Sequence, residues 1–259
     1  MPKATIAQCK EQFAVATIEQ LPALIHRYSN DERTGIHTLL QGARRRIRES
    51  KAERARLEGM NELENLLREQ GVMLAAGVDE VGRGAIAGPV TAAAVVLPPD
   101  TMIESLNDSK KLTPEHRVQI GEQIEEVALA WHVAHVPADQ VDANGIAEAT
   151  KQAMRQALEA LDPQADHIIV DGLPVGLAAA ETAVVGGDSK VAAIAAASIL
   201  AKVSRDDLMR SLARQHPEYG FEINKGYGTA EHIQAIHDIG PCRVHRRSFA
   251  PCSDTIRLF

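Results

Sequence analysis

The chain has 259 residues, enough for one large domain or for one domain with an appendage. Hydrophobic residues make up 45% of it, yet no apolar run approaches the roughly 20 residues that span a bilayer, and the N-terminus lacks the apolar stretch of a signal peptide, so a cytoplasmic protein is expected. The formal net charge of −7 argues weakly against nucleic acid as a partner, although cations bound to a site made of carboxylates would reverse the charge there.

The composition changes near residue 71, which predicts a helical N-terminal extension over residues 1–70 and a second domain over residues 71–259. In the first part, apolar residues such as Leu21 and Leu24 recur at helical spacing. The stretch from Ala43 to Glu58 holds seven Lys and Arg against three Glu, a net charge of +4. It fits a helix lying along phosphates as well as a solvated helix face joined by ion pairs.

From Val72 the pattern is that of an α/β domain, and it begins with two neighbouring strands joined by a tight turn. The segment that reads VAAIAAASILA is apolar almost all round, so its helix should be buried. The expected strands are 72–81, 89–97, 131–136, 167–170 and 182–185, and the expected helices are 114–130, 145–161, 189–215 and 229–239.

Four carboxylates stand in or next to the apolar strands. Asp79 and Glu80 interrupt one strand, Asp171 closes a second, and Asp188 follows a third at the start of the buried helix. Alone, Asp171 could form a turn and Asp188 could cap a helix. Together, the ends of strands in one sheet can converge at one edge, and carboxylates suit Mg²⁺ or Mn²⁺. We therefore expect a site for hard cations there.

Residues suited to phosphate and sugar occur in the same domain. A turn with an arginine between two glycines lets the backbone approach a ligand closely. Lys202 stands four residues before Asp206, so an ion pair between them explains the pattern as well as substrate contact does. The candidate substrate-binding residues are Gly82, Arg83, Gly84, Lys111, Ser198, Lys202 and Tyr227.

Several sequence blocks, in this order and at these spacings, resemble the motif set of bacterial ribonuclease HII: GVDEVGRGAIAGPV, DSKKLT, VDG, GGDSKVAAIAAASILAKVSRD and KGYGT. The resemblance covers about residues 71–259. It implies a ribonuclease H-like fold with a central mixed sheet flanked by helices. It also implies an endonuclease that hydrolyses the RNA strand of RNA–DNA hybrids and cuts on the 5′ side of ribonucleotides embedded in duplex DNA, a role in ribonucleotide excision repair and DNA replication.

The resemblance also assigns roles to residues. It makes Asp79, Glu80, Asp171 and Asp188 the catalytic, metal-binding carboxylates, assigns the ribose 2′-hydroxyl to the Gly-Arg-Gly turn, and packs Tyr227 on the neighbouring deoxyribose. Two Mg²⁺ or Mn²⁺ ions about 3.5–4 Å apart can clamp one phosphate, and the implied products carry a 5′-phosphate and a 3′-hydroxyl. The related ribonuclease HIII has Gly-Lys-Gly in the turn, so Arg83 favours the first type.

Two other functions stay open. One is an activity like that of ribonuclease HIII, confined to longer RNA stretches. The other is a protein that binds hybrids without cutting them, which the presence of all four carboxylates disfavours, because binding alone gains nothing from them.

The C-terminal part carries two weaker signals. Cys242, His245 and Cys252 are too few and too irregularly spaced for a structural zinc site, and the odd number of cysteines argues against a disulfide framework. The final TIRLF, with Leu258 and Phe259, resembles peptides that dock on the bacterial sliding clamp, although a chance hydrophobic end, or one packed on the domain, is the favoured interpretation. We expect a monomer.

Overall fold

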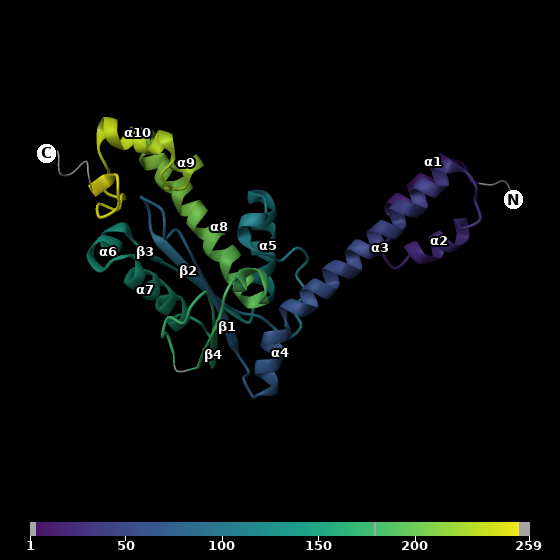
Figure 1. Ribbon diagram of the computed structural model, residues 1–259, viewed down its shortest axis with the longest axis horizontal. Coiled ribbons are helices and arrows are strands. Elements are labelled where there is room, and N and C mark those ends of the chain that lie inside the picture. Colours follow the sequence, from purple (N-terminus) through teal and green to yellow (C-terminus); the bar gives the residue numbers. More distant parts are fainter. Residues whose placement is uncertain (1–3, 179, 254–259) are drawn as a thin grey trace. The chain divides into compact units, whose positions relative to one another are not determined.

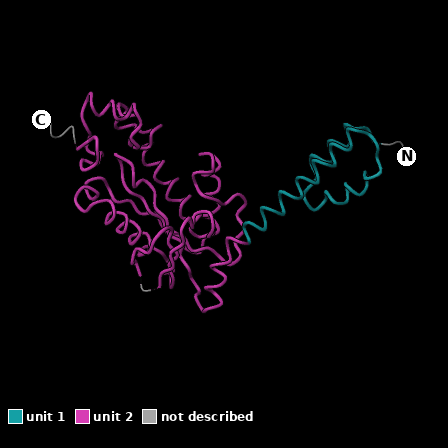
Figure 2. The backbone as a smooth tube through the Cα atoms, viewed as in Figure 1, with its two compact units in different colours: residues 1–58 teal, residues 59–259 magenta. Residues whose placement is uncertain are grey.

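The computed structural model describes residues 4–178 and 180–253. The chain forms two compact units, residues 1–58 and residues 59–259 (Figure 2). None of the helices in the described residues is long and apolar enough to cross a membrane.

The first unit consists of helices α1 (Ile6–Val15) and α2 (Leu21–Tyr28) together with most of α3 (Thr34–Met60). Thr5 caps α1 by accepting a hydrogen bond from the backbone N–H of Gln8, whose side chain accepts from the Thr5 N–H in return. The apolar faces of the three helices enclose a small core of Cys9, Phe13, Ala16, Leu21, Ile36, Leu40 and Ala43.

The second unit is built on a five-stranded mixed sheet in the order β3-β2-β1-β4-β5 (Figure 1). β1 pairs antiparallel with β2 and parallel with β4; β2 pairs antiparallel with β3, and β4 pairs parallel with β5. The strands are β1 (Ala75–Val81), β2 (Val90–Val96), β3 (Ala130–Val136), β4 (His167–Asp171) and β5 (Glu181–Val184).

Helices cover both faces of this sheet. The helices of the unit are α4 (Glu62–Glu69), α5 (Pro114–Val127), α6 (Ala138–Asn144), α7 (Ile146–Glu159), α8 (Ala192–Gln215), α9 (Phe221–Asn224) and α10 (Ala230–Ile239), with short 3₁₀ turns η1 (Ser109–Lys111), η2 (Gly187–Ser189) and η3 (Pro217–Tyr219). The mixed sheet between helices that the resemblance implies is therefore confirmed.

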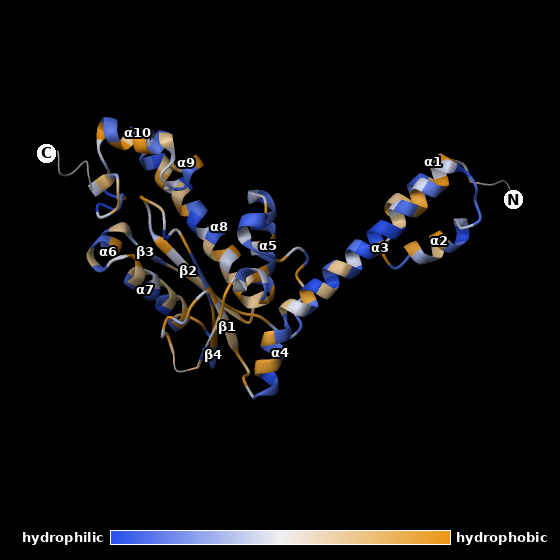
Figure 3. Cartoon of the chain, in the orientation of Figure 1, coloured by the Kyte–Doolittle hydropathy of each residue, from blue (hydrophilic) through white to orange (hydrophobic). Residues whose placement is uncertain are grey.

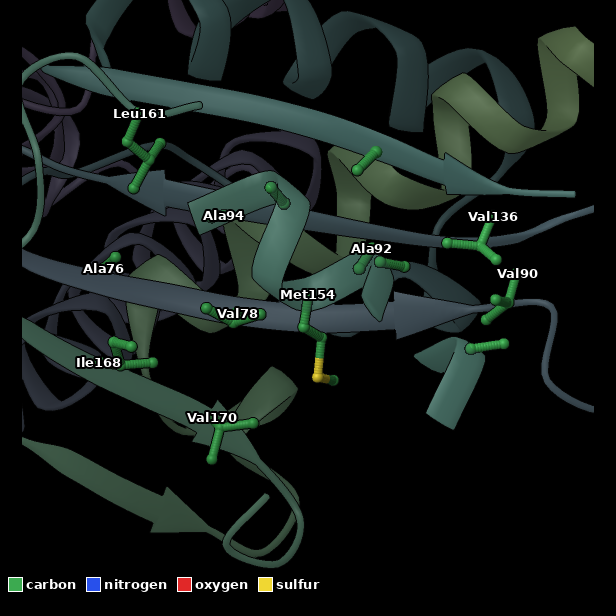
Figure 4. Close-up of a cluster of buried hydrophobic side chains, with 14 of the residues drawn as sticks. Ala76, Val78, Val90, Ala92, Ala94, Val136, Met154, Leu161, Ile168 and Val170 are labelled. Carbon is green, nitrogen blue, oxygen red and sulfur yellow. The ribbon is translucent and has the colours of Figure 1, made fainter. Parts of the chain in front are cut away.

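Small apolar side chains fill the core, because the chain has few aromatic residues. On one face, Ala76 and Val78 of β1 pack with Ala92 and Ala94 of β2 and with Met154 of α7 (Figure 4). On the other face lies α8, whose residues from 192 to 201 are all buried, as the apolar segment predicts. The two helices thus contact β1 from opposite sides, and alternate residues of β1 face each of them.

Close approach of α8 to the sheet depends on Gly77 in the middle of β1. A Cβ atom there would stand 2.1 Å from the backbone carbon of Ala193. Glu64 of α4 fixes the same turn of α8, because its carboxylate accepts a hydrogen bond of 2.9 Å from the Ala193 N–H. Helix α4 is therefore part of the compact unit that contains the sheet.

The structure corrects several sequence-based predictions. Asp188 does not open the long helix: it lies in η2, and α8 starts at Ala192, because the Gly187 carbonyl accepts from the N–H groups of Lys190 and Val191 in a tight turn. The first two strands are joined by residues 82–89, longer than the expected tight turn. Helix α6 was not predicted, and the other ends shift by a few residues.

Candidate active site

The first two carboxylates point to opposite faces of β1. Asp79 faces α8, where the Ser198 hydroxyl lies near its carboxylate, and Asp79 is 7% exposed. Glu80 lies on the other face and lines a cavity shared with α7. This alternation is the one that the strand pattern predicts.

The two later aspartates are joined through η2. Asp171 ends β4, the parallel neighbour of β1, and its carboxylate accepts a 2.6 Å hydrogen bond from the Gly187 N–H. Asp188 follows Gly187 directly and is 9% exposed. The carboxyl ends of β1 and β4 thus bring acidic side chains to one edge of the sheet, as expected for a ligand site in an α/β fold.

Negative charge accumulates at this edge. Burial, together with the charges of Glu80 and Asp171, raises the pKa of Asp79 to about 8. Burial also raises the pKa of Asp188, with further contributions from Asp108 and Asp171. Carboxylates that raise one another's pKa lie close enough to repel, and a bound cation would relieve that repulsion.

The ammonium group of Lys110 faces the cluster. Lys110 Nζ lies 3.7 Å from an oxygen of Asp188 and 4.0 Å from one of Asp108. Burial alone would lower its pKa, but the aspartates at positions 108, 188, 79 and 171 raise it overall. Its side chain is 80% exposed, so it can leave the cluster at little cost.

The donor set suits a divalent metal, since hard cations prefer carboxylate oxygens. Yet across residues 4–178 and 180–253, no three His, Cys, Asp or Glu side chains gather closely enough to hold an ion as they stand. The accumulated negative charge fits a cation.

The Gly-Arg-Gly turn follows Glu80 and is fixed from both sides. Gly82 has φ +87°, and a Cβ there would lie 2.2 Å from Nε of Arg205, so only glycine fits. Arg83 Nη1 lies 3.2 Å from Glu80 Oε1, and the Arg83 carbonyl accepts a 2.9 Å hydrogen bond from Arg246. Gly84 faces open space.

The loop that carries Tyr227 lies against the chain just after this turn. The Gly226 carbonyl accepts hydrogen bonds from the N–H groups of Ile86 and Ala87 at 2.9 and 3.1 Å. The Arg205 guanidinium stacks 5.5 Å from the centre of the Tyr227 ring, which stays partly exposed. The structure therefore brings Tyr227 and the Gly-Arg-Gly turn together, although they are far apart in sequence.

A cavity of about 390 Å³ opens beside the carboxylates Glu80 and Asp171. Glu80 and Asp171 line it from the sheet, Arg83 from the turn after β1, and Thr150 and Lys151 from α7. Sequence reasoning missed both α7 residues, because nothing in the helical pattern distinguishes them from other residues at the helix surface.

The other candidate substrate residues have internal partners. Ser198 Oγ lies 3.1 Å from Ser109 Oγ. Lys202 forms the ion pair with Asp206 that the spacing allows, at 2.7 Å, and Asp206 is also 3.6 Å from Arg117. Lys111 is exposed and lies 3.4 Å from Asn107 Oδ1. Contact of these residues with a substrate stays a prediction.

Two buried arginines were also missed by sequence reasoning. Arg205 and Arg246 are both fully buried, and together they donate to the carbonyls of residues 83, 87, 88, 89 and 225. They tie the turn to the tyrosine loop. Arginine usually stays at the surface, so composition and periodicity gave no signal for this role.

The cysteines form no disulfide among the described residues, as expected. Cys242 Sγ lies 3.2 Å from Nδ1 of His245. Nε2 of His245 lies 3.0 Å from Nε2 of His232, so hydrogen bonds join the cysteine and the two histidines. The C-terminal Leu258 and Phe259 lie outside the described residues, and clamp binding stays a prediction.

Comparisons with known proteins find similar sequences over most of the chain. A family model described as ribonuclease HII matches residues 76–252, and one described as ribonuclease HII N-terminal domain matches residues 5–68. Ribonuclease HII of Listeria monocytogenes serotype 4b is 42% identical over 250 residues, which cover 96% of this chain and 95% of that protein. The boundary that we expect at residue 70 lies between the two matched ranges but beyond the division of the compact units, and it stays a prediction.

Solved structures share the fold. Ribonuclease H2 from Pyrococcus horikoshii OT3 gives a TM-score of 0.63 at 25% identity and covers 72% of this chain and 98% of that one. Bst-RNase HIII, solved in complex with Mn²⁺, gives a TM-score of 0.55 at 20% identity and covers 72% of this chain and 70% of that one.

Proposed function

This chain belongs to the ribonuclease HII family, and on that premise we propose that it cuts on the 5′ side of ribonucleotides embedded in duplex DNA, leaving a 5′-phosphate and a 3′-hydroxyl. Membership of the family makes the chain a ribonuclease H, a hydrolase that acts on RNA–DNA hybrids. The finer statements, on the cut position, the metals and the residue roles, are our proposal.

The observation that carries the proposal is the fixed Gly-Arg-Gly turn beside the carboxylates. RNA differs from DNA at the 2′-hydroxyl, so an enzyme that selects a single ribonucleotide needs backbone groups that come close to the sugar. Gly82 lets the backbone turn at φ +87° against Arg205, and Gly84 leaves the space in front of the turn open to the sugar. The Arg83–Glu80 contact links the turn directly to the acidic edge.

Asp79, Glu80, Asp171 and Asp188 would hold two divalent cations, Mg²⁺ or Mn²⁺. Bound there, such ions supply an activated water and stabilise the leaving 3′-oxygen. The mutual repulsion of the carboxylates supports this role, and a protein of the same fold has been solved with Mn²⁺.

The remaining site residues would position the nucleic acid. Tyr227 presents a partly exposed ring, held by the Arg205 guanidinium, on which a deoxyribose can pack. Lys111 is exposed near the acidic edge and can meet a phosphate. Ser198 lies near Asp79, and Lys202 can contact phosphate only if it leaves Asp206.

The alternative enzymatic activity is one like that of ribonuclease HIII, which would be confined to longer RNA stretches. Arg83 between the glycines, in place of lysine, favours the single-ribonucleotide reading. Binding without cleavage is disfavoured, because the buried carboxylates repel one another and would lower stability without benefit.

The test is cleavage of a DNA duplex that contains one ribonucleotide, with Mg²⁺ and with Mn²⁺, and mapping of the product ends. We expect one cut on the 5′ side of the ribonucleotide and none in an all-DNA duplex of the same sequence. Cleavage only of runs of several ribonucleotides would support the alternative, and no cleavage of any hybrid would leave a binding protein.

A further inference from the structure

Charge is divided unequally between the two compact units. Residues 1–58 hold eleven Lys and Arg and seven Asp and Glu, a net charge of +4, which leaves −11 for residues 59–259. The unit with the acidic site therefore repels a polyanion at long range, apart from its local contacts. A nucleic-acid enzyme of this kind gains from a separate source of attraction.

The positive charge of the first unit is concentrated on α3. Its residues Leu40 and Ala43 pack on α1 and α2. On a helix of about 3.6 residues per turn, Arg45 and Arg48 lie across from that buried face and Arg44 at its edge. All three are exposed, and hydrophilic residues predominate along this part of the helix (Figure 3).

The arginines of α3 fall into two groups. Arg46 turns inward and donates to the carbonyls of Phe13 and Ala16 at 2.8 and 2.9 Å. Arg54 and Arg56 form ion pairs with glutamates of the same helix at 2.9 and 2.7 Å. These are the salt-bridged residues that the sequence allows as one reading.

The second group consists of Arg44, Arg45 and Arg48, which form no ion pair shorter than 3.6 Å among the described residues. Among the described residues, Arg44 and Arg48 have no carboxylate within ion-pair distance. Arg45 reaches Glu49 only at 3.6 Å, with both side chains about two-thirds exposed or more, so water weakens the pair. Three guanidinium groups are thus available to a partner.

These groups surround a hollow of about 600 Å³ lined by Thr38, Gln41, Gly42, Arg44, Arg45 and Arg48. Gly42 has no neighbour within 4 Å of the position of a Cβ, so no side chain fills the space at this part of the lining. Apart from Gly42, every residue that lines the hollow carries a polar or charged side chain, unlike the core of an interface between proteins. Guanidinium forks match the oxygens of a phosphate group.

We propose that this face of α3, formed by Arg44, Arg45 and Arg48, binds the phosphate backbone of a nucleic-acid duplex. This contact rests on the proposed function: it would be a second site at which the enzyme holds the same class of substrate. The contact reads no sequence, since phosphates are the same in every duplex, and it does not distinguish RNA from DNA.

The test is binding of an all-DNA duplex to the full chain, measured by fluorescence anisotropy at several salt concentrations. The variant is Arg44→Glu together with Arg48→Glu. The control, Lys10→Glu with Arg27→Glu, makes the same change in net charge at exposed positions on α1 and α2. The probe holds no ribonucleotide, so the result is independent of whether the chain cleaves hybrids.

We expect the Arg44/Arg48 variant to lose on the order of tenfold in affinity at low salt, and its plot of log affinity against log salt to flatten by about 2 units, since each lost phosphate contact removes about 0.9. The control should stay close to the parent. Equal slopes for variant and parent, or equal losses in variant and control, would overturn the proposal. If the charge-reversed chain melts early, Arg44→Gln with Arg48→Gln removes the same contacts without adding repulsion, and the same slopes decide.

Discussion

The two compact units treat charged side chains in opposite ways. In residues 59–259, ionisable groups enter the interior: Asp79 is 7% exposed, and Arg205 and Arg246 are fully buried. In residues 1–58 the arginines at positions 44, 45 and 48 stay exposed on one helix. Buried charges are held in fixed positions by many partners, which suits chemistry, whereas exposed charges attract a polyanion from a distance.

The net charge of the whole chain is therefore a poor guide to whether it binds nucleic acid. The total of −7 conceals a unit of +4 and a unit of −11. The acidic excess includes carboxylates that suit metal ions, and the basic excess lies elsewhere in the chain. Charge is informative only once it is assigned to the unit that carries it.

The largest effect is expected from the removal of a carboxylate at the acidic edge. We expect Asp171→Asn to lower the cleavage rate by about three orders of magnitude or more, because a metal ligand is lost. Asn keeps the shape and can still accept from the Gly187 N–H, so the melting temperature should change little. Duplex binding, which we assign partly to α3, should persist. Measuring turnover beside a melting curve tests this, and an active variant would refute the site.

The next largest effect is expected at the Gly-Arg-Gly turn, where substitution of Gly82 and of Gly84 should have different consequences for stability. Gly82→Ala places a Cβ 2.2 Å from Arg205 at φ +87°, so we expect a loss of roughly 2–4 kcal/mol in stability and a large loss of cleavage. Gly84→Ala meets open space and should fold normally. A Gly84→Ala chain that melts like the parent but cuts poorly would locate the substrate at the turn. Equal melting temperatures for both variants would show that Arg205 does not hold the turn.

A smaller effect concerns Glu64, where α4 contacts α8. Burial raises the pKa of Glu64 to about 7, although the Ala193 N–H lowers it, and its second carboxylate oxygen is buried without a partner among the described residues. The folded chain therefore keeps a proton that the unfolded chain releases near pH 4.5, and this contribution to stability is complete below that pH and lost as the pH rises through 7.

Glu64→Gln removes this titration and keeps an oxygen for the Ala193 N–H. We expect the variant to melt a few degrees above the parent at pH 8. At pH 4 that advantage should vanish. Glu69→Gln, at an exposed position of the same helix, is the control. If the difference in melting temperature between variant and parent did not change with pH, the raised pKa of Glu64 would be wrong.

Much of the site followed from the sequence, because its residues carry strong local signals. An acidic pair inside an apolar strand and a glycine turn after it can be recognised without a structure, and both lie where the strand pattern puts them. The resemblance to ribonuclease HII then made the fold predictable. What the sequence could not provide were contacts between distant segments, such as Arg246 with residue 83 and Glu64 with Ala193.

The start of α8 shows the same limit at short range. Asp188 looks like a helix cap, since it stands before a long apolar helix. In the structure the tight turn η2 takes its place, and Glu64, far away in the sequence, satisfies the Ala193 N–H. Capping preferences reflect local sequence alone. Here a tight turn and a contact with a distant residue take the place of the Asp188 cap.

The central claim is that the acidic edge performs the chemistry and the basic face of α3 supplies long-range attraction. The most direct test is steady-state cleavage of a duplex with one ribonucleotide by the full chain and by its Arg44→Glu/Arg48→Glu variant, over a range of salt concentrations. We predict the same kcat at saturation at every salt concentration, with a raised KM for the variant at low salt that converges with the parent at high salt. A variant that folds normally but loses kcat at saturation, or keeps the parent's KM at low salt, would contradict the account.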